Sequence, residues 1–209
     1  MGLGKTVQSI ALILANPAMA KSPMCTLIVC PLSVILNWEK QIKDYVNKKF
    51  KVTVWAGADR EKHLVDLGRN KIDVLLVSYG TLGSDYKNFK SSNEEDDNFG
   101  IFDVAFHRVI LDEAHTIRNA STGFFKSVKA LKTERKLCLT GTPFNNHPND
   151  IQSLLSFLNV EPLSDKNVFD YAVTDEIMRK KEIGLVRLRT IMAHVALRRT
   201  KEQVEGNLG

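Results

Sequence analysis

The chain has 209 residues, of which 44% are hydrophobic and 25% charged, enough apolar material for one sizeable core with a small accessory module. Its 29 Lys and Arg residues exceed its 24 Asp and Glu residues, and the formal net charge of +5 permits nucleic-acid binding without requiring it. The composition excludes a disordered tail, and the absence of any long apolar stretch or secretory signal pattern argues against a membrane or secreted protein. The cysteines at 25, 30 and 138 form no CxxC pair, so we expect free thiols in a reducing compartment of the cell rather than a disulfide framework or a zinc ribbon.

Five short apolar runs are continuous rather than alternating, which is typical of strands buried on both faces of a parallel sheet. They span residues 26–30, 52–55, 74–77, 109–111 and 137–139. Segments with helical spacing lie before, between or after them, at residues 6–15, 33–46, 121–131 and 149–158. The alternation of strands and helices predicts an open α/β sheet with right-handed crossovers.

The helix expected at residues 33–46 carries an N-terminal signal and one apolar face. Ser33 is its candidate N-cap, because a serine side chain can accept a hydrogen bond from the first turn. The residues that we expect on the apolar face are Val34, Ile35, Trp38, Ile42 and Tyr45.

Two segments depart from this alternation of strands and helices. Residues 90–100 contain the polar, acidic run SSNEEDDN, which we interpret as a solvated surface loop, with a regulatory acidic element as the alternative. Residues 167–197 have a helical pattern without a strand candidate and are followed by Arg198 and Arg199, which predicts a helical appendage packed on the sheet domain.

The chain begins with MGLGKT, and GKT at the start of a helix is the end of a Walker A loop. In such a loop the backbone N–H groups and the helix N-terminus bind phosphates, Lys5 reaches the terminal phosphates, and the Thr6 hydroxyl binds Mg²⁺. The tripeptide alone also occurs by chance at helix starts. The full pattern and the strand that leads into it would lie upstream of Met1, so we expect an empty position inside the sheet.

Residues 108–115, RVILDEAH, form an apolar strand that ends in two acids. In a Walker B strand one carboxylate binds Mg²⁺ and the next activates the attacking water, which suits Asp112 and Glu113 respectively. The alternative is a surface strand end with incidental acids. Residues 139–143, LTGTP, follow the last expected strand and either sense the γ-phosphate or form an ordinary strand-to-helix turn.

In chain order, these segments resemble the motifs of Swi/Snf-type ATPases, helicase-like proteins of superfamily two. The motifs that carry the resemblance are MGLGKT at 1–6, CPLS at 30–33, NW at 37–38, SY at 78–79, DEAH at 112–115, TGTP at 140–143 and LRRTK at 197–201. The run VILDEAHTIRN at 109–119 is most similar to the DNA-repair subgroup that includes the helicase-like transcription factor.

The resemblance implies an α/β fold: a RecA-like parallel sheet sandwiched by helices, which is a P-loop NTPase lobe truncated before its first strand, with a C-terminal helical appendage. Residues 1–160 would form the N-terminal ATP-binding lobe, incomplete at its start, and residues 161–209 a helical extension leading toward an absent second lobe.

The resemblance also implies a role for each matching residue. ATP would be bound by Gly2, Gly4, Lys5 and Thr6, Mg²⁺ by Thr6 and Asp112, and catalysis would use Lys5 and Glu113. Nucleotide state would be coupled to the DNA-facing side by His115, Thr140 and Thr142, and the DNA backbone would be contacted by Ser33, Asn37, Ser78 and Thr81.

Three features qualify this assignment. Trp38 lies on the apolar face of its helix, which favours a core position over a DNA contact. The LRRTK segment is compatible with a helix C-terminus or with DNA contact. Residues 144–146 are FNN where the family usually has an apolar residue followed by Gln-Asn, so any contact made by that glutamine is shortened by one methylene.

The function that the resemblance implies is that of the ATP-binding lobe of a DNA-dependent ATPase, which uses ATP and Mg²⁺ to translocate on double-stranded DNA in DNA repair or chromatin remodelling. Chromatin or repair proteins would be further partners, the location would be the nucleus, and no membrane would be involved. Other P-loop enzymes fit poorly, since the NKxD of a GTPase is missing. A truncated, catalytically inactive fragment that only binds DNA or protein partners stays open, because neither the adenine-recognising segment nor a second lobe with its arginine finger is in the sequence.

Overall fold

The structure is a computed structural model that describes residues 3–19, 23–46, 50–57, 59–91, 100–142 and 147–199. Several predicted features lie outside these residues. They are Gly2 of the phosphate loop, residues 92–98 of the acidic run, Pro143 with the FNN segment, and residues 200–201 of the basic end.

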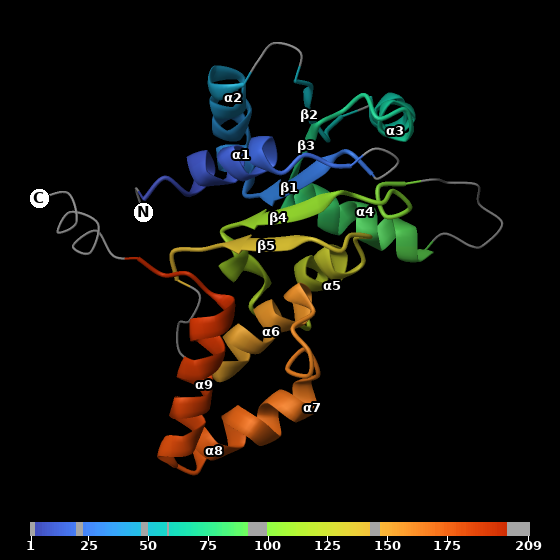
Figure 1. Cartoon of the computed structure of the whole chain (residues 1–209). Coiled ribbons are helices and arrows are strands. Elements are labelled where there is room, and N and C mark those ends of the chain that lie inside the picture. Colours follow the sequence, from blue (N-terminus) through green and yellow to red (C-terminus); the bar gives the residue numbers. More distant parts are fainter. Residues whose placement is uncertain are drawn as a thin grey trace, which may run out of the picture.

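Five parallel strands form one sheet, which confirms the five predicted strands (Figure 1). They are β1 (Thr26–Cys30), β2 (Val52–Val54), β3 (Val74–Ser78), β4 (Arg108–Asp112) and β5 (Lys136–Leu139), in the spatial order β2-β3-β1-β4-β5. β1 lies at the centre, where Thr26 pairs with Val74 on one side and with Arg108 on the other. The sheet is continuous, so the expected empty position inside it is wrong: β4 pairs directly with β5, and β2 and β5 form the edges among the described strands.

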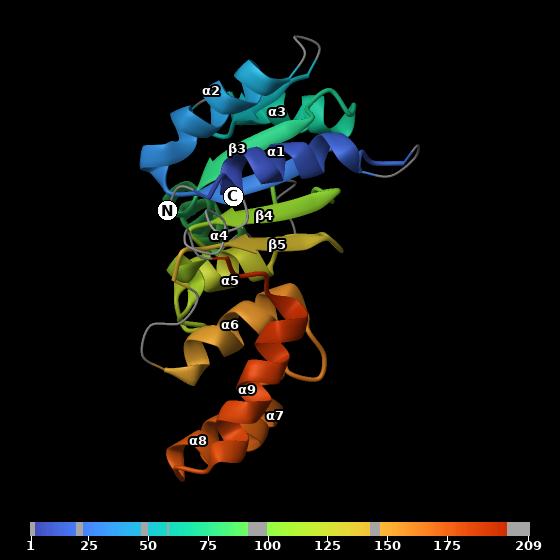
Figure 2. The same ribbon diagram turned by 60° about the vertical axis from the view of Figure 1, so that its left-hand side comes forward.

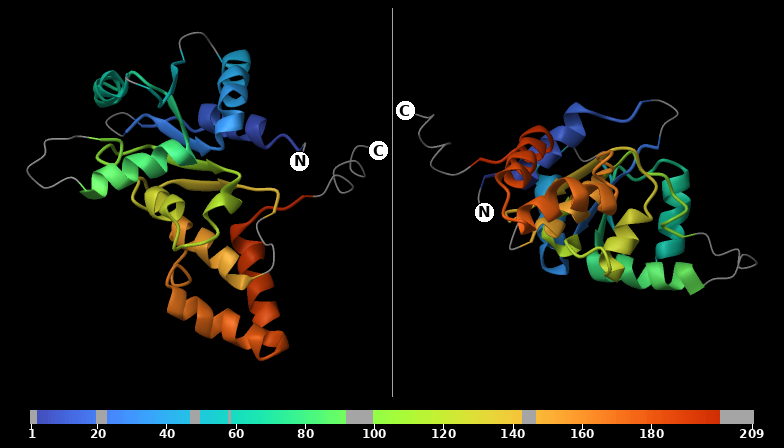
Figure 3. Two further views of the ribbon diagram at one scale, coloured as in Figure 1. Left: turned by 180° about the vertical axis from the view of Figure 1, so that it is seen from behind. Right: turned by 90° about the horizontal axis from the view of Figure 1, so that it is seen from below.

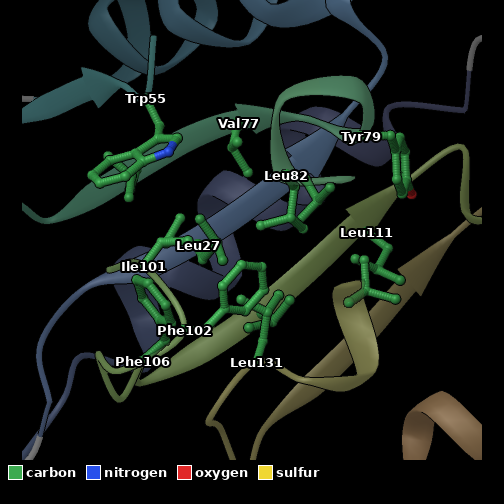
Figure 4. Packing of buried hydrophobic residues seen from close by; sticks show 14 of the residues in the cluster. Leu27, Trp55, Val77, Tyr79, Leu82, Ile101, Phe102, Phe106, Leu111 and Leu131 are labelled. Atoms are coloured by element: carbon green, nitrogen blue, oxygen red, sulfur yellow. The ribbon is translucent and has the colours of Figure 1, made fainter. Parts of the chain in front are cut away.

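Helices cover both faces of the sheet because successive strand residues point to opposite sides. On one face Ile28 and Cys30 of β1 pack with α1 (Lys5–Ala15) and α2 (Ile35–Tyr45). On the other face Leu27 and Val29 pack in the core cluster drawn in Figure 4. That cluster includes side chains of α3 (Arg60–Gly68), α4 (Tyr79–Ser91), α5 (Gly123–Lys129) and α6 (Pro148–Leu158). Seen from behind in the left panel of Figure 3, α4 lies in front of the sheet.

The predicted start of the second helix is wrong. A 3₁₀ turn, η1 (Leu32–Val34), precedes α2, whose N-cap is Val34, so Ser33 lies within the turn and not at the cap. The apolar face is correct for Ile35, Trp38 and Ile42, which are buried, but Tyr45 in the last turn is 59% exposed. Helices α3 and α4 were not predicted, because α3 has few apolar residues and α4 contains glycine and polar residues that blur the helical period.

The C-terminal part is helical, as predicted. It contains α7 (Lys166–Phe169), a π-helical turn η3 (Asp170–Thr174), α8 (Asp175–Met178) and α9 (Glu182–Val195), and Figure 2 shows these elements beyond α6. A separate apolar cluster joins Phe169, Val173 and Leu188 to Ile151 and Leu155 of α6. The described part of the chain has no helix that is both long and apolar enough to cross a bilayer.

Helix α6 therefore belongs to two cores at once. Leu154 and Phe157 pack in the cluster beneath the sheet, while Ile151 and Leu155 pack against the appendage. The division of the chain at residue 160 stays a prediction. Arg198 and Arg199 follow the end of α9 in non-helical backbone.

The three cysteines should be unreactive in the native protein. Burial raises the pKa of Cys30 and Cys138 to about 12, with Asp112 adding to the effect on Cys30, and burial also raises the pKa of Cys25. At pH 8 a thiol with a pKa of about 12 is ionised in about one molecule in 10⁴, and the thiolate is the reactive form. We expect a chromogenic disulfide reagent to label the native chain slowly and to label three thiols in guanidinium chloride. Rapid labelling of one native thiol would contradict this.

Candidate active site

The predicted phosphate loop and the predicted acidic pair lie at the same edge of the sheet. Lys5 is the first residue of α1, and its Nζ lies 3.8 Å from Oε1 of Glu113, which directly follows β4. The strand register pairs Asp112 with Leu139, so Thr140 leaves β5 beside Glu113. This edge is formed by the carboxyl ends of the strands, where ligands of open α/β sheets bind.

The start of α1 has the features of a phosphate site. Gly4, its N-cap, has φ of 70° in the left-handed region that favours glycine, and no side chain of the described residues caps the helix. The first N–H groups of a helix have no partners within it and carry its positive dipole end. The Lys5 Nζ is buried and has no hydrogen-bond partner among the described residues. A buried ammonium without a hydrogen bond in the described part of the chain, beside a helix start without a side-chain cap there, fits a polyphosphate.

The other end of α1 is held by Arg108, the first residue of β4. Its guanidinium donates to the carbonyl oxygens of Leu12, at 3.3 Å, and of Asn16. It also lies 2.9 Å from Nε2 of His107, whose pKa is lowered by burial and by the neighbouring Arg108 charge, so the neutral ring can accept the hydrogen bond. This role of Arg108 was not predicted, because a basic residue at a strand start carries no signal of its distant partner.

Asp112 is held by three hydrogen bonds from different parts of the chain. Nε1 of Trp38 donates to Oδ2 at 2.8 Å, and the Glu113 N–H donates to Oδ1 at 2.9 Å. The Tyr79 hydroxyl donates to the Asp112 carbonyl oxygen at 2.9 Å, and burial raises the pKa of Tyr79, which keeps this donor protonated. Trp38 is 1% exposed, so the core position expected for it is correct, but its bond to Asp112 was not predicted.

Glu113 lies between two basic side chains. Its Oε1 faces Lys5, and its Oε2 lies 3.2 Å from Nδ1 of His115. Its backbone has φ of 48° and ψ of 51°, a left-handed conformation that costs free energy in a residue other than glycine. The structure thus brings Lys5, Glu113 and His115 into one cluster beside Asp112.

The remaining predicted residues of this edge make contacts of their own. Thr6 follows Lys5 in the first turn of α1 and is half-buried. Oγ1 of Thr140 accepts a hydrogen bond from the N–H of Thr142 at 3.1 Å, which closes the turn after β5, and Thr142 is exposed. The register, rather than a side-chain contact, therefore places Thr140 near Glu113.

The four residues predicted to contact DNA fall into two kinds of environment. Ser33 and Asn37 are exposed at the start of α2, where Asn37 Oδ1 accepts a hydrogen bond from Gln41. Ser78 is buried, and its Oγ accepts the N–H of Thr81 at 3.0 Å, which is the bond of an N-cap at the start of α4. The Ser78 hydroxyl is therefore used within the fold.

The model of the SNF2-related domain matches residues 1–209. The chain belongs to this family. Its fold agrees, because the parallel five-stranded sheet with flanking helices matches the RecA-like lobe of the SNF2 ATPase core.

Individual relatives place the SNF2-related domain among larger proteins. The human helicase-like transcription factor is 36% identical over 86% of this chain and 17% of its own length. DNA repair protein RAD5 of Cryptococcus neoformans is 34% identical over 88% of this chain and 16% of its own length. The solved SWI2/SNF2 ATPase core of Sulfolobus solfataricus in complex with dsDNA is 30% identical, with a TM-score of 0.75, over 96% of this chain and 39% of that one. This chain therefore spans a minor part of each.

Replacement of Arg108 should loosen α1. In Arg108→Leu the carbonyl oxygens of Leu12 and Asn16 lose their charged donor, so we expect the free energy of unfolding to fall by about 1–3 kcal/mol. Hydrogen exchange should accelerate in the last turn of α1. Arg189→Leu, at an exposed position of α9, is the matched control and should change neither quantity. Equal destabilisation by the two variants would refute the role of Arg108.

Proposed function

We propose that the chain is the ATP-binding lobe of a DNA-dependent ATPase that translocates on double-stranded DNA, acting in DNA repair or chromatin remodelling in the nucleus. The observation that carries this proposal is the buried ammonium of Lys5, which has no hydrogen bond among the described residues and faces Glu113 beside Asp112 at the carboxyl edge of the sheet. The names of the relatives support the setting, since they include a DNA repair protein and, in Arabidopsis thaliana, a putative regulator of chromatin. Chromatin or repair proteins are the further partners that we propose.

ATP and Mg²⁺ are the substrate and metal that this site fits. The N–H groups at the start of α1, with Gly2 and Gly4, would bind the phosphates, and Lys5 would bind the terminal ones. The Thr6 hydroxyl and the Asp112 carboxylate would hold Mg²⁺, which neutralises developing charge on the phosphoryl oxygens. The two free lone-pair positions on Asp112, one on each oxygen, remain available for this.

Glu113 acts as the base that orients the attacking water and accepts its proton. In the structure its carboxylate faces Lys5, and the 3.8 Å separation is longer than a hydrogen bond. When Lys5 binds phosphate, Glu113 loses this partner and its Oε1 becomes available to water. His115 stays against Oε2 and, with Thr140 and Thr142, couples the state of the site to the DNA-facing side.

DNA contact in this proposal is made without reading sequence. Ser33 and Asn37 are exposed beside the start of α2 and can bind backbone phosphates. Ser78 is buried, and we propose that it holds Thr81 in place at the start of α4. One solved structural neighbour is in complex with dsDNA, which supports duplex DNA as the ligand.

A second candidate is a lobe that binds DNA or partners without turning over ATP on its own. It is the alternative that the sequence leaves open, and the chain spans 39% of the solved SWI2/SNF2 ATPase core. Phosphate release with and without duplex DNA separates the two, with Glu113→Gln as the blank. Stimulated turnover that is lost in the blank supports the ATPase, and turnover at background supports the second candidate.

Lys5 and Glu113 should have separable roles. Lys5→Ala removes the ammonium that binds phosphate and should weaken ATP binding about tenfold or more. Glu113→Gln keeps the shape of the side chain but removes the base, so ATP binding should persist while any hydrolysis stops. Titration with a fluorescent ATP analogue measures binding in both variants, and phosphate release measures hydrolysis. Lys62→Ala, at an exposed position of α3, is the control. Equal loss of binding in the Lys5 and Glu113 variants would refute the separation.

DNA affinity should depend on salt and not on sequence. Because phosphate contacts dominate, we expect the logarithm of the association constant to fall linearly with the logarithm of the salt concentration. Ser33→Ala combined with Asn37→Ala should weaken binding roughly tenfold, and equally for duplexes of unrelated sequence. Fluorescence anisotropy with two such duplexes is the measurement. A flat salt dependence, or a loss confined to one duplex, would be incompatible with backbone contact.

A further inference from the structure

The indole of Trp38 is fixed in the core while its one polar atom contacts the predicted metal ligand. Trp38 lies in α2 and packs in the cluster that contains Ile28 of β1 and Ile110 of β4. Its Nε1 donates to Oδ2 of Asp112 at 2.8 Å. A ring held on all sides cannot follow the carboxylate, so the carboxylate must take the orientation that the ring sets.

Two hydrogen bonds define the plane of the Asp112 carboxylate. The Glu113 N–H holds Oδ1, and Trp38 holds Oδ2, so rotation of the carboxyl group would break both bonds. A carboxylate oxygen can accept two hydrogen bonds or ligate a metal with a remaining lone pair. Each carboxylate oxygen of Asp112 therefore keeps one free lone pair, and the bond from Trp38 sets the direction in which these two lone pairs point.

We propose that Trp38 is a positioning residue for Mg²⁺: it orients Asp112 and thereby sets how much Mg²⁺ strengthens nucleotide binding. This inference rests on the proposed function, because it takes Asp112 as the metal ligand. Groups that hydrogen-bond to a metal ligand commonly change metal affinity by about 10- to 100-fold when they are removed. The bond also ties Asp112 to α2, whose exposed side carries Asn37.

The chain contains a matched control for this role. Trp55, the only other tryptophan, is 3% exposed, and its Nε1 donates to Oδ2 of Asp85 at 2.7 Å. Asp85 is also bound by Arg60 at 2.6 Å. In Figure 4 Trp55 and Tyr79, which bonds to Asp112, lie at opposite ends of the cluster. Replacement of either tryptophan by phenylalanine removes the same chemistry, but only Trp38 contacts the site.

The test compares ADP affinity in Mg²⁺ with ADP affinity in EDTA, measured by calorimetry for the 209-residue chain, Trp38→Phe and Trp55→Phe. We expect the gain in affinity caused by Mg²⁺ to fall about tenfold or more in Trp38→Phe, with the affinity in EDTA unchanged. In Trp55→Phe the gain in ADP affinity caused by Mg²⁺ should equal that of the unchanged chain. An equal gain in all three proteins, or an equal loss with and without Mg²⁺ in Trp38→Phe, overturns the inference. If the unchanged chain itself gains nothing from Mg²⁺, the proposed function falls as well.

A second measurement covers the case in which Trp38→Phe does not fold. In Trp55→Phe, Trp38 is the one remaining tryptophan, so its fluorescence is read directly. Adding Asp112→Ala removes the carboxylate at 2.8 Å from its Nε1, and we expect a shift of the emission maximum. An emission spectrum that is the same with and without the carboxylate would show that the bond does not form, which overturns the inference.

Discussion

Burial of the central strands on both faces is the constraint on which the rest of this structure depends. β1 and β3 are buried at every residue, so they must be covered by helices on both sides. Strands joined through such helices run parallel, and their carboxyl ends then all emerge at one edge. Residues that are far apart in the chain meet there: Lys5 follows a loop, Glu113 follows β4, and Thr140 follows β5. The site is thus a consequence of strand direction.

Features with a local signal could be predicted from the sequence. Continuous apolar runs identified all five strands, and the order of short motifs led to the family. Features that depend on a contact between distant parts of the chain could not be predicted. Arg108 and Trp38 look like an ordinary strand start and an ordinary core residue, because their partners, Asn16 and Asp112, are 92 and 74 positions away. Ser33 met the local rule for a helix cap, but η1 shifted the start of α2 past it.

The site concentrates arrangements that a purely structural protein would avoid. Glu113 has a left-handed backbone, and among the described residues α1 begins without a side-chain cap and the buried Lys5 ammonium has no hydrogen bond. Each costs free energy in isolation, and such costs cluster where a ligand compensates them. The surrounding fold supplies the rigidity, since Trp38 and Tyr79 hold Asp112 from opposite faces of the sheet.

The two ends of α1 contact the two ends of β4. Lys5 at the start of the helix meets Glu113 just past the strand, and Arg108 at the start of the strand binds the last turn of the helix. An α-helix of 11 residues is about 16 Å long, and so is a strand of five. The helix and the strand therefore have about equal lengths, and one contact joins them at each end. A one-residue deletion shortens α1 by about 1.5 Å or β4 by about 3.3 Å, and either change alters the spacing between these two contacts.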